Sequence, residues 1–151
     1  MDAKQLREHI IKPVLNGLEM YSEAAENLVF GTAAVESGLL YVRQFNEGPA
    51  RGLWQMEPAT HDDIAKNWPS FHKYKEQVLL ISGASEISPA NLEHNLRYAC
   101  AFTRLHYWRK PVGLPAAEDV TSLGHYWKQH YNTPLGKGTV EHFEKAYRRF
   151  K

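Results

Sequence analysis

Glu36 is the residue whose type and position could do acid–base chemistry. It follows the apolar, small-residue run of residues 30–35 and stands just before Ser37-Gly38, where the glycine favours the end of a helix. The carboxyl end of a helix carries partial negative charge and apolar neighbours desolvate a carboxylate, so both effects should raise the pKa of Glu36. A carboxyl group that stays protonated near neutral pH can donate a proton to a leaving oxygen.

Two short motifs follow Glu36 in the sequence. Residues 52–55 begin sixteen positions beyond Glu36 and read Gly-Leu-Trp-Gln, and residues 58–60 read Pro-Ala-Thr. With the Glu36-Ser37 pair and the Gly-Pro-Ala-Arg of residues 48–51, this order closely resembles the lytic transglycosylases, a family of peptidoglycan-cleaving enzymes. Their pattern is Glu-Ser, a short loop, Gly-Leu-Met-Gln and then Pro-Ala-Thr, and these parts seldom occur together at this distance by chance.

The resemblance continues at lower strength and covers residues 22–138. Residues 95–102 are similar to the family's Asn-Ile-x-x-Gly-x-x-Tyr, with Ala in place of Gly and Phe in place of Tyr. Residues 130–134 read His-Tyr-Asn-Thr-Pro and resemble the family's Ala-Tyr-Asn-Ala-Gly. Tyr131 and Asn132 are retained. The other three residues differ from those of the family, which indicates that this wall of the substrate site has a different shape.

The resemblance implies an all-α, lysozyme-like fold and a reaction that uses one carboxyl group. Glu36 would protonate the oxygen of the β-1,4 bond between N-acetylmuramic acid and N-acetylglucosamine. It would then act as base on the C6 hydroxyl of the same muramic ring, which yields a 1,6-anhydro sugar without water or a second carboxylate. Tyr131 would hold Glu36 in position by hydrogen bonding. Gln55 and Asn132 would contact the sugar, Ser37 would orient the substrate, and no cofactor is implied.

Two other functions stay open from the residues alone. Hydrolytic lysozymes and chitinases share the helical fold but use a flap carboxylate to activate water, and Glu47 lies in the loop where that group is expected, although it also fits a plain turn. From a different class, the chain could be a non-catalytic cell-wall-binding or virion structural module. Such a module would have no reason to keep Glu36 beside an intact Gly-Leu-x-Gln. Further carboxylates that could serve a hydrolase are Glu57, Asp62 and Asp63.

The other reactive side chains favour structural roles. The eight His residues include no His-Glu-x-x-His, so we expect no metal site. Cys100 lies between two alanines on an apolar stripe, where a thiol is typically a small buried hydrophobe. Among the aromatic residues, Trp54 has the best claim to line a sugar groove because it lies inside the motif.

Helical spacing of apolar residues dominates the chain, and no segment shows a sustained period of two. Residues 22–37 predict the helix that carries Glu36, begun by Ser22 and stopped at Gly38. Residues 38–52 lack that spacing and predict a small irregular or β-hairpin flap. We expect one all-α domain over residues 1–151. Its other predicted helices are 6–18, kinked or divided at Pro13, then 58–68, 71–81, 88–109, 118–130 and 139–150.

The amino-acid composition limits the kinds of molecule that the protein is expected to bind. The chain has 18 Lys plus Arg against 17 Asp plus Glu, so we expect no nucleic-acid partner. A single Cys excludes an intramolecular disulfide, and the apolar stretches are too short for membrane insertion. The chain begins without a signal-peptide pattern. We therefore expect a monomer, made in the cytoplasm, that binds peptidoglycan glycan strands. With the resemblance, this is typical of a bacteriophage lytic protein, either an endolysin released with a holin or a virion-borne enzyme.

Overall fold

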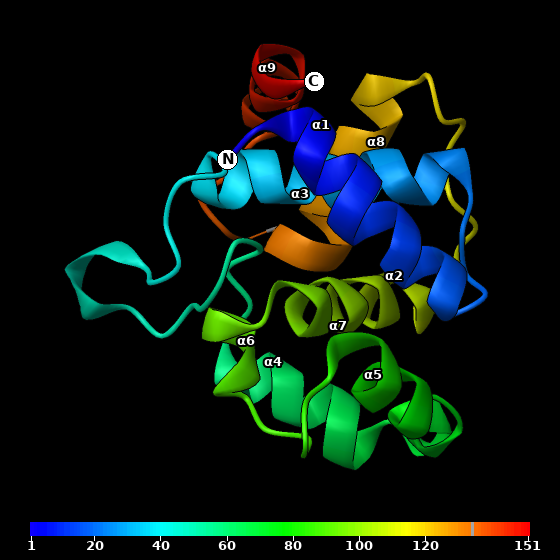
Figure 1. The fold of residues 1–151 in the computed structure, drawn as a ribbon. Coiled ribbons are helices and arrows are strands. Elements are labelled where there is room, and N and C mark those ends of the chain that lie inside the picture. The colour runs from blue at the N-terminus through cyan, green and yellow to red at the C-terminus, as the bar shows by residue number, and fades with distance from the viewer. Residues whose placement is uncertain (134) are drawn as a thin grey trace.

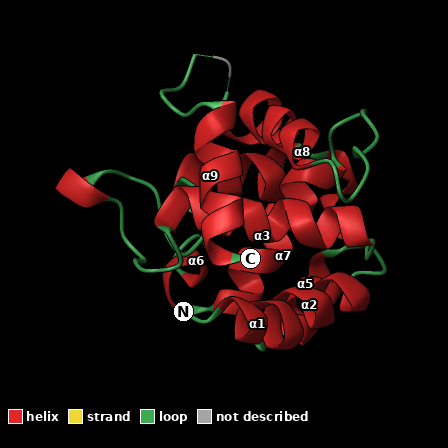
Figure 2. Cartoon of the chain, turned by 90° about the horizontal axis from the view of Figure 1, so that it is seen from above, coloured by secondary structure: helices red, strands yellow, loops and turns green. Residues whose placement is uncertain are grey.

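The computed structural model describes residues 1–133 and 135–151. Within these residues every regular element is helical, which confirms the all-α prediction (Figures 1 and 2). Pro134, the last residue of the expected 130–134 motif, lies outside the described residues. The α-helices are α1 (Ala3–Leu6), α2 (Lys12–Gly17), α3 (Glu23–Ser37), α4 (Pro58–Asp62), α5 (Lys75–Ser82), α6 (Asn91–His94), α7 (Leu96–Trp108), α8 (Val120–Trp127) and α9 (Val140–Phe150).

Helix α3 occupies the centre of the fold, as its small and apolar residues require. Every residue from 25 to 34 is buried. The Ser22 side chain accepts a hydrogen bond from the Ala25 N–H at the start of the helix, and Gly38 ends it in a left-handed conformation with φ 59°. Both predicted ends are therefore confirmed. Helix α7 runs below α3 in Figure 1, with α8 and α9 above, and contacts join α3 to all three.

The predicted N-terminal helix is divided, and Pro13 gives the reason. Proline has no N–H to donate to the carbonyl four residues earlier, which here belongs to His9. The backbone forms a π-helical turn at Arg7–Ile11, between α1 and α2. Pro13 lies in the first turn of α2, where a missing N–H is tolerated. The His9 carbonyl accepts instead from the Arg97 guanidinium at 3.5 Å.

The prediction of one long helix over 88–109 is wrong, because the helix is interrupted at Asn95. This residue has an extended backbone (φ −125°, ψ 99°) between α6 and α7. Its side-chain oxygen accepts from the Tyr98 N–H, and its amide donates to the Ser82 carbonyl at 3.0 Å. Asparagine can cap a helix better than it can continue one, so α7 begins here.

The flap between α3 and α4 is irregular and contains no strand among the described residues. Two isolated bridges, Arg43 with Arg51 and Arg51 with Met56, hold its base together. Its one regular element is a single 3-10 turn, Phe45–Glu47. Figures 1 and 2 show this turn at the tip of a projection that stands away from the helices.

The remaining segments pack on either side of α3 and α7. The predicted helix 58–68 is α4 followed by a π-helical turn at Asp63–Asn67, and 71–81 is a 3-10 turn at Pro69–Lys73 followed by α5. Helix α8 continues into a π-helical turn, Lys128–Asn132, and α9 begins at a capping box of Thr139 and His142. No helix of the described residues is long and apolar enough to cross a membrane.

Candidate active site

Glu36 lies in the last turn of α3 and is half-buried. The indole N–H of Trp127 donates a 3.0 Å hydrogen bond to its Oε2 atom. Burial raises the pKa of Glu36 to about 7, and the Trp127 hydrogen bond opposes this rise by favouring the charged form. A carboxyl group with this pKa is protonated in a large fraction of molecules near neutral pH, as expected from its sequence position.

A column of packed residues sets the position of Trp127. Gly31, in the middle of α3, lies against the ring of Phe143 from α9, and a Cβ atom at Gly31 would clash with that ring. Phe143 in turn packs against Trp127, with ring centroids 5.8 Å apart. Trp127 is 2% exposed, so its N–H needs a partner inside the protein, and Glu36 provides it. The glycine on α3 thus allows the packing that positions the donor to Glu36.

Three tyrosines, Tyr41, Tyr107 and Tyr131, lie near Glu36. The Tyr41 hydroxyl donates to the Glu36 backbone carbonyl at 2.8 Å, and the Tyr107 hydroxyl is 2.8 Å from the Thr32 hydroxyl, one turn before Glu36. Burial raises the pKa of Tyr41, Tyr107 and Tyr131, and the charge of the nearby Glu36 carboxylate raises each of them further. These hydroxyls therefore stay protonated, and those of Tyr41 and Tyr131 donate to backbone carbonyls of the protein.

Tyr131 lies close to Glu36, but its hydroxyl does not make the bond that we expected. It donates to the backbone carbonyl of Trp54 at 2.5 Å. The donor to Glu36 is Trp127, which lies four residues before Tyr131 and thus on the same side of a helical segment. Tyr131 therefore fixes the segment after α8 against the 52–55 motif.

Trp54 belongs to the core and not to a groove, contrary to expectation. Its side chain is 1% exposed, and its indole N–H donates to the Val29 carbonyl in α3 at 2.9 Å. The Trp54 carbonyl accepts from Tyr131. This residue joins α3, the 52–55 motif and the end of α8, which explains a tryptophan at the variable position of Gly-Leu-x-Gln.

The turn formed by residues 52–55 has a geometry that requires its glycine. Gly52 has φ 76°, and a Cβ atom there would collide with the backbone carbonyl of Leu92. Gln55 also has a left-handed backbone, with φ 49°. Its side-chain amide donates to the Gly52 carbonyl at 2.8 Å, and the residue is 8% exposed. The N–H groups of Gln55 thus close the turn, which leaves its side-chain oxygen as the group that could meet a sugar.

The other expected site residues lie in three different environments. Asn132 is partly exposed, and its side-chain oxygen accepts from Lys128 at 2.8 Å. The Ser37 hydroxyl is buried and donates to the Ala33 carbonyl at 3.1 Å, so it is turned into its own helix. Glu47 is exposed in the 3-10 turn at the tip of the flap, with φ 58°. The structure brings Tyr131 close to Glu36, joins Trp54 to Val29 in the middle of α3, and leaves Glu47 on the projection.

The thiol of Cys100 lies in the core of the protein. Cys100 is fully buried, and burial raises the pKa of its thiol, which favours the unreactive protonated form. Within residues 1–133 and 135–151, no three His, Cys, Asp or Glu side chains are close enough together to hold a metal ion.

The sequence did not identify Trp127 as the hydrogen-bond partner of Glu36. The signal of Trp127 is the i, i+4 spacing to Tyr131, which is easily taken for ordinary core periodicity. Comparison of the chain with family models, curated proteins and solved structures finds no match. The assignment of the site therefore depends on its geometry and on the sequence motifs.

Proposed function

We propose that the protein is a lysozyme-like lytic transglycosylase that cleaves the glycan strands of peptidoglycan. The observation that carries the proposal is the carboxyl group of half-buried Glu36, which lies at a helix end and has a pKa of about 7. An acid of this kind can protonate a glycosidic oxygen at neutral pH. The position of the flap, between the Glu36 helix and the 52–55 turn, supports the lysozyme-like fold.

The proposed reaction uses the same carboxyl group twice. Glu36 first gives its proton to the glycosidic oxygen, and the bond from that oxygen to C1 of the muramic ring breaks. The resulting carboxylate then takes the proton of the C6 hydroxyl while O6 bonds to C1. Glu36 is protonated again at the end, the products are a 1,6-anhydro muramic end and a free hydroxyl on N-acetylglucosamine, and no water is consumed.

The neighbours of Glu36 suit these two roles. The Trp127 N–H occupies Oε2, so Oε1 is available for proton transfer, and the bond also stabilises the carboxylate formed between the two steps. The side-chain oxygen of Gln55 and the amide of Asn132 are the groups we assign to the N-acetyl or hydroxyl groups of the sugar. Ser37 takes a structural part in this account, because its hydroxyl is buried in α3.

Hydrolysis by a pair of carboxylates is the alternative within enzymes. In retaining glycosidases the two carboxyl groups are about 5 Å apart, and at that distance the charge of one strongly raises the pKa of the other. Among the described residues, no second carboxylate contributes to the raised pKa of Glu36, which is set by burial and Trp127. This argues against a retaining pair at Glu36, and Glu47 lies exposed at the tip of the flap.

A non-catalytic wall-binding module is the alternative outside enzymes. Keeping a carboxyl group in a site that raises its pKa from 4.5 to about 7 costs folding free energy whenever the group is ionised. A binding module gains nothing from that cost, whereas an acid catalyst needs it. The Glu36 environment therefore favours catalysis.

The masses of the products distinguish these functions. Purified peptidoglycan is digested with the full chain, and the released muropeptides are analysed by mass spectrometry. The proposal predicts fragments that end in 1,6-anhydro muramic acid, each lighter by one water than the hydrolysis product. Reducing ends would assign a lysozyme, cleavage of chitin oligosaccharides would assign a chitinase, and binding without fragments would assign a module.

A further inference from the structure

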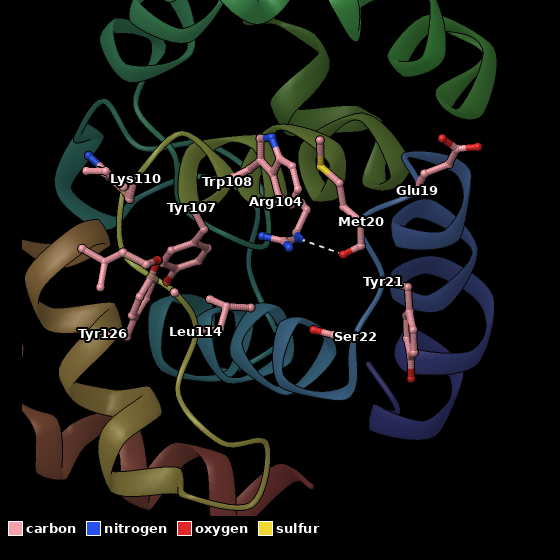
Figure 3. Close-up of a pocket in the computed structure, with 13 residues that line it drawn as sticks. Glu19, Met20, Tyr21, Ser22, Arg104, Tyr107, Trp108, Lys110, Leu114 and Tyr126 are labelled. Carbon is pink, nitrogen blue, oxygen red and sulfur yellow. Dashed lines mark hydrogen bonds between the residues drawn. The ribbon is translucent and has the colours of Figure 1, made fainter.

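A cavity of about 560 Å³ opens at the other end of α3 from Glu36 (Figure 3). It is formed by residues 19–22 before α3, by the last turns of α7 and by the loop of residues 110–114, and Tyr126 closes one side. Ser22 and Glu36 are fourteen residues apart along a helix, which corresponds to about 20 Å. Its lining does not include Glu36, Trp127 or Gln55, so the cavity is separate from the candidate active site. Its volume is in the range that holds a small molecule.

Arg104 is the residue that makes this cavity unusual. It is 5% exposed, and its Nε–H donates to the Met20 carbonyl at 3.1 Å. Neither terminal amino group of its guanidinium has a hydrogen-bond acceptor among the described residues, and no carboxylate there pairs with it. Figure 3 shows the guanidinium amid the lining residues, between Met20, Tyr107 and Trp108. The guanidinium carbon lies 5.2 Å from the centre of the Trp108 ring.

Two other shielded arginines of the same chain have carboxylate partners. Arg7 is 2.6 Å from Glu26 and also donates to Asn27, and Arg109 is 2.7 Å from Asp63. Removing a guanidinium from water without such a partner is unfavourable, and burial accordingly lowers the pKa of Arg104. The free donors of Arg104 face the cavity and lack the anion that accompanies its counterparts.

The surroundings of Arg104 indicate what kind of anion fits. A guanidinium presents two parallel N–H groups that match the two oxygens of a carboxylate. The walls beside it are mainly apolar or aromatic, including Leu114, Tyr126 and Trp108. The one carboxylate of the lining, Glu19, is exposed and points away from the guanidinium in Figure 3.

We propose that this cavity is a binding site for a small organic carboxylate with an apolar body, held by the two free amino groups of Arg104. Trp108 and Tyr126 would pack against the apolar body, and Lys110 adds a second positive charge to the lining. A ligand held by Arg104 would lie in a cavity whose lining does not include Glu36 or Trp127. Carboxylate binding and glycan cleavage can therefore be lost independently of each other.

The test compares phenylacetate with phenylacetamide, which has nearly the same shape but no charge. Each is titrated into the ¹⁵N-labelled full chain, and the Trp108 indole and Arg104 Nε–H signals are followed by NMR. The proposal predicts that phenylacetate binds at least about tenfold more tightly than the amide, as a charge-assisted bidentate pair should. Equal affinity of the two probes, or no shift of these signals with millimolar phenylacetate, would overturn it.

Three variants locate the binding site. Arg104→Gln should remove the preference for phenylacetate, and Leu114→Trp should block binding by filling the cavity while Arg104 stays in place. Arg97→Gln is the matched control, because Arg97 is an exposed arginine of the same helix outside the cavity. If Arg104→Gln does not fold, Leu114→Trp alone decides, and unchanged phenylacetate binding in that variant contradicts the proposal.

Discussion

The indole N–H of Trp127 and the carboxylate of Glu36 form a 3.0 Å hydrogen bond between residues that are 91 positions apart. The bond joins the end of α8 to the last turn of α3. It favours the charged carboxylate, whereas burial favours the neutral acid and has the larger effect. The pKa of Glu36 near 7 is the balance of these two effects.

Replacing Trp127 by Phe should therefore move the pH dependence of cleavage. The activity of a general acid falls as pH rises through its pKa, so kcat/KM of the wild-type protein should decline above about pH 7. Loss of the N–H donor removes the effect that lowers the pKa of Glu36, so the decline should move to higher pH. Trp108→Phe is the control, because Trp108 donates to Tyr74 and not to Glu36. A decline that stays in place or moves to lower pH would contradict this role of Trp127.

Replacing Glu36 by Gln should stabilise the protein at high pH. The pKa of Glu36 is raised in the folded state, so the folded protein binds this proton more tightly than the unfolded chain. Ionisation costs no stability below pH 4.5, the cost grows between pH 4.5 and about 7, and it is constant above that range. The shift corresponds to about 3 kcal/mol at most.

Urea unfolding of Glu36→Gln and wild type at about pH 4 and about pH 8 measures this difference. The variant should gain free energy of unfolding at the higher pH and little at the lower one. An equal change at both values would mean that the carboxyl group is not strained by ionisation.

Replacing Gly52 by Ala should destabilise the turn that carries Gln55. Alanine disfavours the left-handed backbone, and its Cβ would collide with the Leu92 carbonyl, which cannot rotate away. We expect a loss of about 2 kcal/mol or more in the free energy of unfolding. Gly113→Ala is the control, since nothing lies within 4 Å of a Cβ there, and it should change stability by about 0.5 kcal/mol at most. Similar values for both variants would show that Gly52 is not needed for its conformation.

Much of the helical structure could be predicted because its signals are local. Ser22, Gly38 and Thr139 act on backbone groups within a few residues, so the ends of α3 and the start of α9 can be read from short stretches of sequence. Asn95 was missed because the apolar residues on either side of it, Leu92 and Ala99, keep the helical spacing across it. Only the competition between its capping bond to Tyr98 and the helical backbone shows where α7 begins.

In the candidate site, too, local features could be predicted from the sequence and contacts between distant residues could not. The direction of the Glu36 pKa shift followed from its position at a helix end among apolar residues. Its partner did not, because the position of Trp127 depends on packing between distant segments, including Phe143 on Gly31. The family resemblance implied a hydrogen bond from Tyr131 to Glu36, whereas the Tyr131 hydroxyl bonds to Trp54.

The most direct test of the account is the rate at which purified peptidoglycan is solubilised by wild type, Glu36→Gln and Glu47→Gln. The first substitution keeps the shape of the side chain and removes the transferable proton, whereas the second removes a carboxylate from the tip of the flap. The account predicts that Glu36→Gln loses about 10²-fold to 10⁴-fold in rate, while Glu47→Gln stays near wild type. A folded Glu36→Gln protein that solubilises peptidoglycan at the wild-type rate would contradict the central claim.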